Sequence, residues 1–357
     1  MGATGADGDG GAGGGTINSY YLLFSLMKGT RQNPESYFRS EIPSANKLYH
    51  YTDARGLEGI AQNRILWMSN INYLNDSEEY YYTFDLTKKV LEKYYPGLLE
   101  YNKINFDRER VSNIFSFSLS EKEDLLSQWR GYCPNGGFAI SLDVQQFNEI
   151  IKENDFKVIK CIYNPRWQEA FIIRHVIGFS PAEYMYEFEK ERQEGTVGYA
   201  AGIYSSQMNN IWLRMNKAAS ILKHPSFSEE AEWRVIKDLN DSSISNESLI
   251  YSVEHHLMKI DSEKMLIREG QGDAETQNRL DKLISGSVKT RISRNILVPY
   301  IEIMLLNNSK KRVNISDLIV GPTPHKRIAL EAARVFAKIN TDCSVDVRSS
   351  DIPYVNW

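Results

Sequence analysis

Apolar and polar residues alternate along most of this chain with the periods that distinguish strands from helices. Strands are predicted where apolar or aromatic residues take every second position, or form short runs between turn residues. These segments are residues 47–52, 65–70, 111–120, 136–143, 156–164, 230–239, 288–305, 315–322 and 343–350. Apolar residues three or four positions apart predict helices over residues 53–64, 75–95, 123–132, 144–154 and 324–340.

Residues 165–223 have a different pattern, which is apolar at helical spacing, rich in charge and without a strand signal. We interpret them as a helical insertion of two or three helices. The remaining pattern predicts a single α/β (α+β) domain over residues 16–357. Parallel and antiparallel strands should be mixed, because some connections are as short as a hairpin and others contain a helix.

The first fifteen residues are dominated by glycine, holding 8 of the 23 glycines of the chain. This composition buries too little apolar surface to order itself, so residues 1–15 are interpreted as a flexible leader.

Composition describes a globular chain without a global basic character. Its 357 residues carry a net charge of −4, which gives no general attraction for nucleic acid or anionic membranes. Cys133, Cys161 and Cys343 are widely spaced and odd in number, which argues against a disulfide framework. No apolar run reaches 18 residues, so we expect a cytoplasmic protein without a membrane partner.

The common catalytic and phosphate-binding motifs are absent from the sequence. It contains no G-x-G-x-x-G after a strand, no G-K-[ST], no H-E-x-x-H and no G-x-S-x-G. The adjacent His255 and His256 would point to opposite faces of a strand, which makes a poor metal site. No metal site is predicted.

Polar residues instead occupy strand positions where apolar residues would be expected. His50 stands in an aromatic strand, with Leu48 and Thr52 on its face by alternation. Glu232 and Arg234 share one strand face at roughly 7 Å spacing. Each placement has a structural alternative, since a strand histidine can be a hydrogen-bonded packing residue and Glu232–Arg234 an ion pair.

Two further segments hold polar aromatic residues. Trp129 and Tyr132 lie one turn apart in a predicted helix, where core packing is the alternative interpretation. Tyr73 and Asn75 stand at the entry to the helix predicted over residues 75–95.

Several motifs occur in a fixed order along the chain, which are "LYHYTDARGLEGI", "ILWMSNINYLNDSEE", "FSLSEKEDLLSQWRGY", "GGFAISLD", "HPSFSEEAEWRV", "RNILVPYIEIML", "LIVGP" and "RSSDIPY". In this order they resemble the bacterial family catalogued as domain of unknown function 2971. The resemblance spans roughly residues 45–356 and is weakest in the insertion.

The "LYHYT" strand, followed by a helix and a second strand, is more distantly similar to ADP-ribosyltransferases, including poly-ADP-ribose polymerases and DNA-modifying toxins. That resemblance implies a split mixed sheet, NAD as substrate and a histidine, tyrosine and glutamate as catalytic residues. His50 with Thr52 matches the first motif, Tyr132 or Tyr73 the second, and Glu232 the third. The residues predicted to contact NAD are His50, Tyr51, Thr52, Tyr73, Asn75, Trp129 and Arg234.

The residue types suit cleavage of the bond between nicotinamide and ribose. A carboxylate stabilises the oxocarbenium-like centre, a histidine holds the ribose, and an aromatic ring packs on nicotinamide. The acceptor of ADP-ribose would be a protein, a nucleic acid or water, and a bacterial toxin or anti-phage effector with an activator or antitoxin partner would be a natural setting. The alternatives are a nucleotide-binding sensor without turnover and a protein-interaction module.

Overall fold

The computed structural model describes residues 41–43, 47–74, 77–103, 112–208, 211–239, 249–293, 295–306, 314–341 and 344–353. The glycine-rich leader, Asn75 and Cys343 lie outside these residues.

Within the described residues, ten strands form one mixed sheet, which confirms the predicted α/β class. They are β1 (Tyr49–Thr52), β2 (Ile65–Asn70), β3 (Ile114–Ser120), β4 (Phe138–Leu142), β5 (Lys157–Lys160), β6 (Glu232–Asp238), β7 (Lys289–Ser293), β8 (Ile296–Met304), β9 (Ile315–Val320) and β10 (Asp346–Ser349). The order is β10-β9-β4-β1-β3-β2-β8-β7, and β6 pairs with both β3 and β5. Strands β9 and β10 are parallel, and the other strand ladders are antiparallel.

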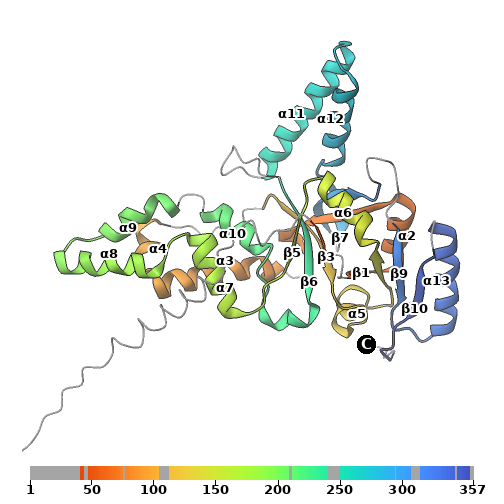
Figure 1. The fold of residues 1–357 in the computed structure, drawn as a ribbon, viewed down its shortest axis with the longest axis horizontal. Coiled ribbons are helices and arrows are strands. Elements are labelled where there is room, and N and C mark those ends of the chain that lie inside the picture. Colours follow the sequence, from red (N-terminus) through yellow and green to blue (C-terminus); the bar gives the residue numbers. More distant parts are fainter. Residues whose placement is uncertain are drawn as a thin grey trace, which may run out of the picture.

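One face of the sheet, here called the α2 face, is apolar and covered by three helices (Figure 1). These are α2 (Ala54–Asn63), α6 (Val144–Glu153) and α13 (Lys326–Asn340). Strand β3 shows why the face is apolar, because Phe115, Phe117 and Leu119 alternate with serines and pack in this core. Asp53 and Asp143 cap α2 and α6 by accepting the backbone N–H of the third residue of each helix.

The opposite face, here called the α5 face, is covered by two separate groups of helices. The short helix α5 (Leu126–Tyr132) packs near β1, β4 and β9. The second group packs on β3, β5 and β6 through Ile114, Ile159 and Ile236. It consists of α3 (Ser77–Tyr94), α4 (Leu98–Tyr101), α7 (Pro165–Phe171), α8 (Pro181–Glu194), α9 (Tyr199–Tyr204) and α10 (Ile211–Ala219).

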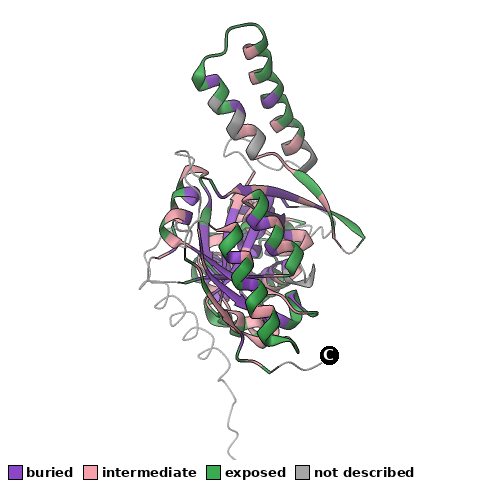
Figure 2. Ribbon diagram, turned by 90° about the vertical axis from the view of Figure 1, so that its right-hand side faces the viewer, coloured by how far each residue is buried: buried purple, intermediate pink, exposed green. Residues whose placement is uncertain are grey.

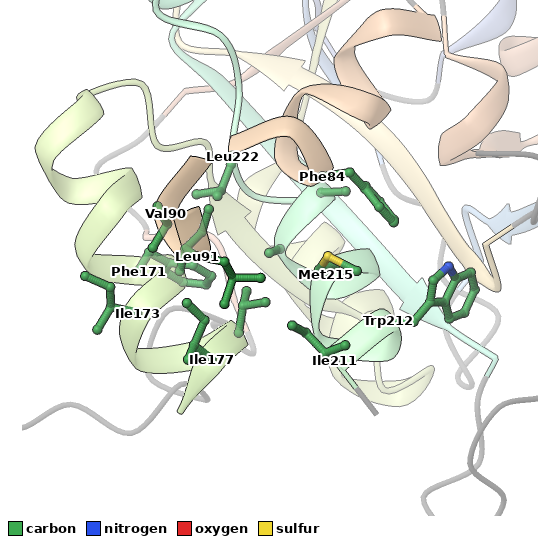
Figure 3. Close-up of a cluster of buried hydrophobic side chains, with 14 of the residues drawn as sticks. Phe84, Val90, Leu91, Phe171, Ile173, Ile177, Ile211, Trp212, Met215 and Leu222 are labelled. Atoms are coloured by element: carbon green, nitrogen blue, oxygen red, sulfur yellow. The ribbon is translucent and has the colours of Figure 1, made fainter. Parts of the chain in front are cut away.

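The predicted insertion is helical but contains more elements than the two or three expected. Helix α7 continues into a π-helical segment, Ile172–Ile177, and α8, α9 and α10 follow. Their apolar side chains share one core with α3, as Figure 3 shows for Phe84, Phe171 and Met215. The capping box at Ser180 and the left-handed Gly195 give α8 separate ends, which helical periodicity alone does not locate.

A helical hairpin of α11 (Leu249–Arg268) and α12 (Ala274–Ser285) projects away from the sheet (Figures 1 and 2). The sequence pattern predicted no element here, because the apolar residues of α11 do not gather on one side and many remain exposed. His255 and His256 lie in α11, so the strand placement expected for them is wrong. Among the described helices, none combines the length and apolarity needed to cross a bilayer.

The sheet is split along one edge of β3. Strand β1 pairs with β3 only at Tyr49–Ser120, whereas β2 pairs with the same edge at Ser116 and Phe115. Between these two contacts β3 keeps its full ladder to β6 on the other edge. Strand β1 therefore leaves β3 after one residue and continues along β4.

Gly137, directly before β4, lies close to the backbone of β1. A Cβ atom at Gly137 would lie 2.6 Å from the carbonyl oxygen of Thr52 and 2.7 Å from Cys133 Sγ. Because that carbonyl belongs to the β1 ladder, Gly137→Ala should lower the free energy of unfolding by about 1–3 kcal/mol. Gly59→Ala is the control, since nothing lies near its Cβ position and it should stabilise α2 by about 0.5–1 kcal/mol. Urea unfolding of both variants checks the prediction, and equal stability would contradict it.

Candidate functional site

A hollow lies on the α5 face where β1 leaves β3, between α5 and the start of β6. Its volume is about 30 Å³, which is room for one or two water molecules, and it opens to solvent. The side chains and backbone around it come from β1, β3, α5 and the start of β6. They belong to Tyr49, His50, Tyr51, Ser118, Leu119, Ser120, Gln128, Tyr132, Glu230 and Glu232.

His50 reaches the hollow because of the split. By register it faces the α2 side, opposite Ile140 and beside Phe117, whose ring centroid is 4.5 Å away. Its Nδ1 lies 3.2 Å from the carbonyl oxygen of Ser118. The backbone of β1 does not pair with β3 at Ser118, because the two strands pair only at Tyr49–Ser120. A carbonyl only accepts, so Nδ1 carries the proton in this contact.

The ring of His50 is neutral at physiological pH. Burial lowers the pKa of His50 to about 4, and the bond to Ser118 opposes this only in part. In a neutral ring with a proton on Nδ1, Nε2 is a hydrogen-bond acceptor. His50 is thus suited to accept a bond from a ligand hydroxyl.

The carboxylate of Glu232 is buried, at 5 % exposure, in a network of cations. Its Oε1 accepts from Arg234 Nε at 2.9 Å, and its Oε2 accepts from Lys223 Nζ at 2.7 Å and Arg234 Nη2 at 3.1 Å. Burial alone would raise the pKa of Glu232, but the charges of Arg234 and Lys223 outweigh it and hold that pKa well below its usual range. Glu232 is therefore a permanent anion and a weak base.

Lys223 connects this carboxylate with a second one. Its buried Nζ also lies 2.6 Å from Oε2 of Glu230, which lines the hollow. Two carboxylates and two cations make the cluster formally neutral, which is the condition for burying so many charges. Lys223 is the last residue of the predicted insertion, so the insertion supplies one member of the site.

The C-terminal end of helix α10 contacts the Arg234 guanidinium. Its Nη1 lies 3.5 Å from the carbonyl oxygens of Ala219 and Ser220, at the C-terminal end of that helix. Helix C-termini favour a positive charge. Arg234 is therefore fixed beside the Glu232 carboxylate, to which it donates two hydrogen bonds.

Helix α5 is fixed against β1 and the C-terminal segment. Tyr51 Oη accepts the N–H of Leu125 at 3.1 Å, and the Tyr51 and Trp129 rings meet edge to face at 4.6 Å. Asp124 Oδ1 accepts from Trp129 Nε1 at 2.7 Å and from Ser350 Oγ at 2.6 Å. These contacts determine where α5 presents its other side to the hollow.

The structure brings together the three residues predicted to be catalytic, because His50, Tyr132 and Glu232 all line the hollow. Of the residues predicted to contact NAD, Tyr51 also lines it, while Arg234 lies behind Glu232. Thr52, Tyr73 and Trp129 are not among the lining residues, and Asn75 lies outside the described residues. Trp129 is 3 % exposed in a core with Tyr49, as its packing alternative expected.

The sequence interpretation missed Ser118, Gln128, Glu230 and Lys223. Glu230 was visible as a second carboxylate two positions before Glu232, but it precedes the strand in the 3-10 turn Pro225–Glu230. Lys223 carried no signal, because its role depends on where α10 ends. In the part of the chain with assigned positions, no three His, Cys, Asp or Glu residues cluster as metal ligands would.

Residues 128–235 match the family model DUF2971, described as a protein of unknown function. The match begins at Gln128 in α5 and ends in β6, so it includes most of the hollow's α5 and β6 lining but not His50. No curated protein and no solved structure matches the chain.

Removing the Glu232 charge should destabilise the protein. Glu232→Gln leaves Arg234 and Lys223 buried with too little negative charge, which costs about 3–5 kcal/mol for such a pair. The exposed Glu229→Gln is the matched control and should change the free energy of unfolding by less than about 0.5 kcal/mol. Denaturant unfolding at pH 7 measures both, and a Glu232→Gln variant as stable as the control would contradict the buried network.

His50 should make stability depend on pH. Its pKa is about 4 in the folded chain and 6.5 in the unfolded chain, so protonation favours the unfolded state. The contribution of neutral His50 to the free energy of unfolding is fully present above pH 6.5 and declines as the pH falls toward 4. His50→Gln keeps a donor for the Ser118 carbonyl. In this variant the thermal unfolding midpoint should depend less on pH between 6.5 and 4 than in wild type. The exposed His325→Gln is the control, and a parallel profile for His50→Gln would refute the assignment.

Proposed function

We propose that the hollow widens to bind the nicotinamide–ribose end of NAD and that the protein is an ADP-ribosyltransferase-like enzyme. It would cleave the bond between nicotinamide and ribose and transfer ADP-ribose to a macromolecule or to water. The observation that carries the proposal is the convergence of His50, Tyr132 and Glu232 on one hollow, from β1, α5 and β6.

Each residue offers what that reaction needs. His50 Nε2 accepts a bond from a ribose hydroxyl, which positions the sugar. Tyr132 is 38 % exposed at the mouth, where its ring packs against the nicotinamide ring. Glu232 stabilises positive charge on the ribose as the bond breaks, and its Oε1, which accepts from Arg234 Nε, has room to accept a second bond.

The low pKa of Glu232 makes its contribution electrostatic. A carboxylate paired with Arg234 and Lys223 takes up a proton poorly, so Glu232 does not act as the base that activates the acceptor. Neutral nicotinamide leaves with the bonding electrons, and the acceptor loses its proton to solvent or to a group of its own. A protein or nucleic-acid acceptor would approach over α5, which lines the hollow.

The biological setting that follows is a bacterial toxin or anti-phage effector acting in the cytoplasm. Such an enzyme would need an activator or an antitoxin partner to control NAD consumption, and its acceptor would be a protein or a nucleic acid. These partners belong to the proposal by analogy with the resembling enzymes.

One observation favours a second candidate, a nucleotide-binding sensor without turnover. Both oxygens of Glu232 already accept bonds from cationic groups, so the site can bind a ribose while stabilising little additional positive charge. Binding of NAD without release of nicotinamide would favour this candidate. A protein-interaction module is the outcome if no nucleotide binds.

Release of nicotinamide from NAD tests the proposal directly. Wild type should release it, alone or with cell lysate as a source of acceptor or activator. Tyr132→Ala and His50→Gln should each reduce the rate by on the order of 10²-fold, because each loses a positioning contact. Tyr186→Ala is the control, since that tyrosine is 71 % exposed on α8 and should keep the full rate.

Glu232→Gln should reduce the rate by on the order of 10²–10³-fold, provided that circular dichroism shows a folded variant at the assay temperature. Label from the ADP-ribose half, found on protein, on nucleic acid or in solution, identifies the acceptor. Equal rates for wild type and all three site variants would contradict the proposed site.

A further inference from the structure

Gln128 is a largely buried residue whose amide faces the hollow. Gln128 is 7 % exposed and lines the hollow together with Tyr132, four residues later on the same side of α5. Trp129 and Cys133 occupy the other side and pack in the core with Tyr51. The hollow is therefore the surface that the Gln128 amide meets.

No hydrogen bond to the Gln128 side chain is found among the residues that the structure describes, although the amide offers two donors and one acceptor. The Gln128 amide therefore depends on solvent in the hollow for its hydrogen bonds, whereas buried amides are normally satisfied by protein groups. Gln168 shows this in the same molecule, because its Nε2 donates to the carbonyls of Ile162 and Lys223 and its Oε1 accepts from Tyr82 Oη.

An amide facing a small hollow is complementary to another primary amide. The two groups can exchange a pair of hydrogen bonds, with each N–H meeting the other carbonyl oxygen. A carboxylate in the same place offers no donor to the Gln128 oxygen. It would also stand near the carboxylates of Glu230 and Glu232, which line the same hollow.

We propose that Gln128 recognises the carboxamide of nicotinamide and is the residue by which the site distinguishes NAD from its nicotinic-acid counterpart. The assignment rests on the proposed function, whose ligand it specifies. In this assignment, Gln128 and Tyr132 of α5 contact the nicotinamide. His50 and Glu232 of the strands contact the ribose.

The test compares ligands that differ only in this group. Binding of nicotinamide, nicotinic acid, NAD and deamido-NAD is measured by calorimetry, and cleavage of the two dinucleotides is measured in parallel. Wild type should bind each amide at least about 10-fold more tightly than its acid. Binding the acid would leave the Gln128 amide without its matching hydrogen bonds.

Two substitutions and one control complete the design. Gln128→Leu, nearly equal in volume, should fold and reduce the preference to about 3-fold or less, and Gln128→Lys should shift it toward the acids. Gln62→Leu, on the exposed side of α2, should retain the wild-type preference.

The outcomes separate the assignment from the reaction. Amide-selective binding that Gln128→Leu removes, without cleavage of NAD, would support the assignment and refute the proposed reaction. Cleavage with an unchanged preference in both Gln128 variants would overturn the assignment alone. No binding of any of the four ligands by wild type would overturn both.

Discussion

The hollow depends on a single constraint, which is that β1 pairs with β3 at one residue and then follows β4. In a continuous sheet, His50 and Glu232 would lie on opposite faces, separated by the backbone. Because β1 departs after Tyr49, the His50 ring occupies the gap and bonds the carbonyl of Ser118. The same bond explains a polar residue in an apolar strand, since it satisfies a backbone group that the split leaves without its ladder.

A neutral cluster of charges stabilises the other wall. Arg234 and Lys223 keep Glu232 ionised, and Glu230 balances the second cation. This arrangement combines a structural role with a chemical one. The ion pair considered as the structural alternative for Glu232 and Arg234 is present, and it is also what makes Glu232 a fixed anion at the edge of a hollow.

Helix α5 forms the third wall, and its position depends on contacts with the C-terminal segment. Asp124 joins Trp129 to Ser350, so the C-terminal segment helps to orient the helix that carries Gln128 and Tyr132. The packing of Trp129 and the exposure of Tyr132 are thus two sides of one element. The one-turn spacing that suggested a shared surface for these two residues did not distinguish the core side from the open side.

The sequence alone determined the strands and helices of the sheet domain, because local periodicity reflects which face of an element is buried. It also singled out His50 and Glu232, because polar residues at apolar positions are visible without a structure, whereas Tyr132 was chosen through the resemblance to ADP-ribosyltransferases. It did not reveal the α11–α12 hairpin, whose apolar residues follow no single face, or Lys223 and Gln128. Only the tertiary structure decided those, because a buried ion pair and a buried amide are defined by what lies across the space from them. Lys223 meets Glu232 only where the insertion returns to the sheet, and Gln128 meets the hollow only where β1 parts from β3.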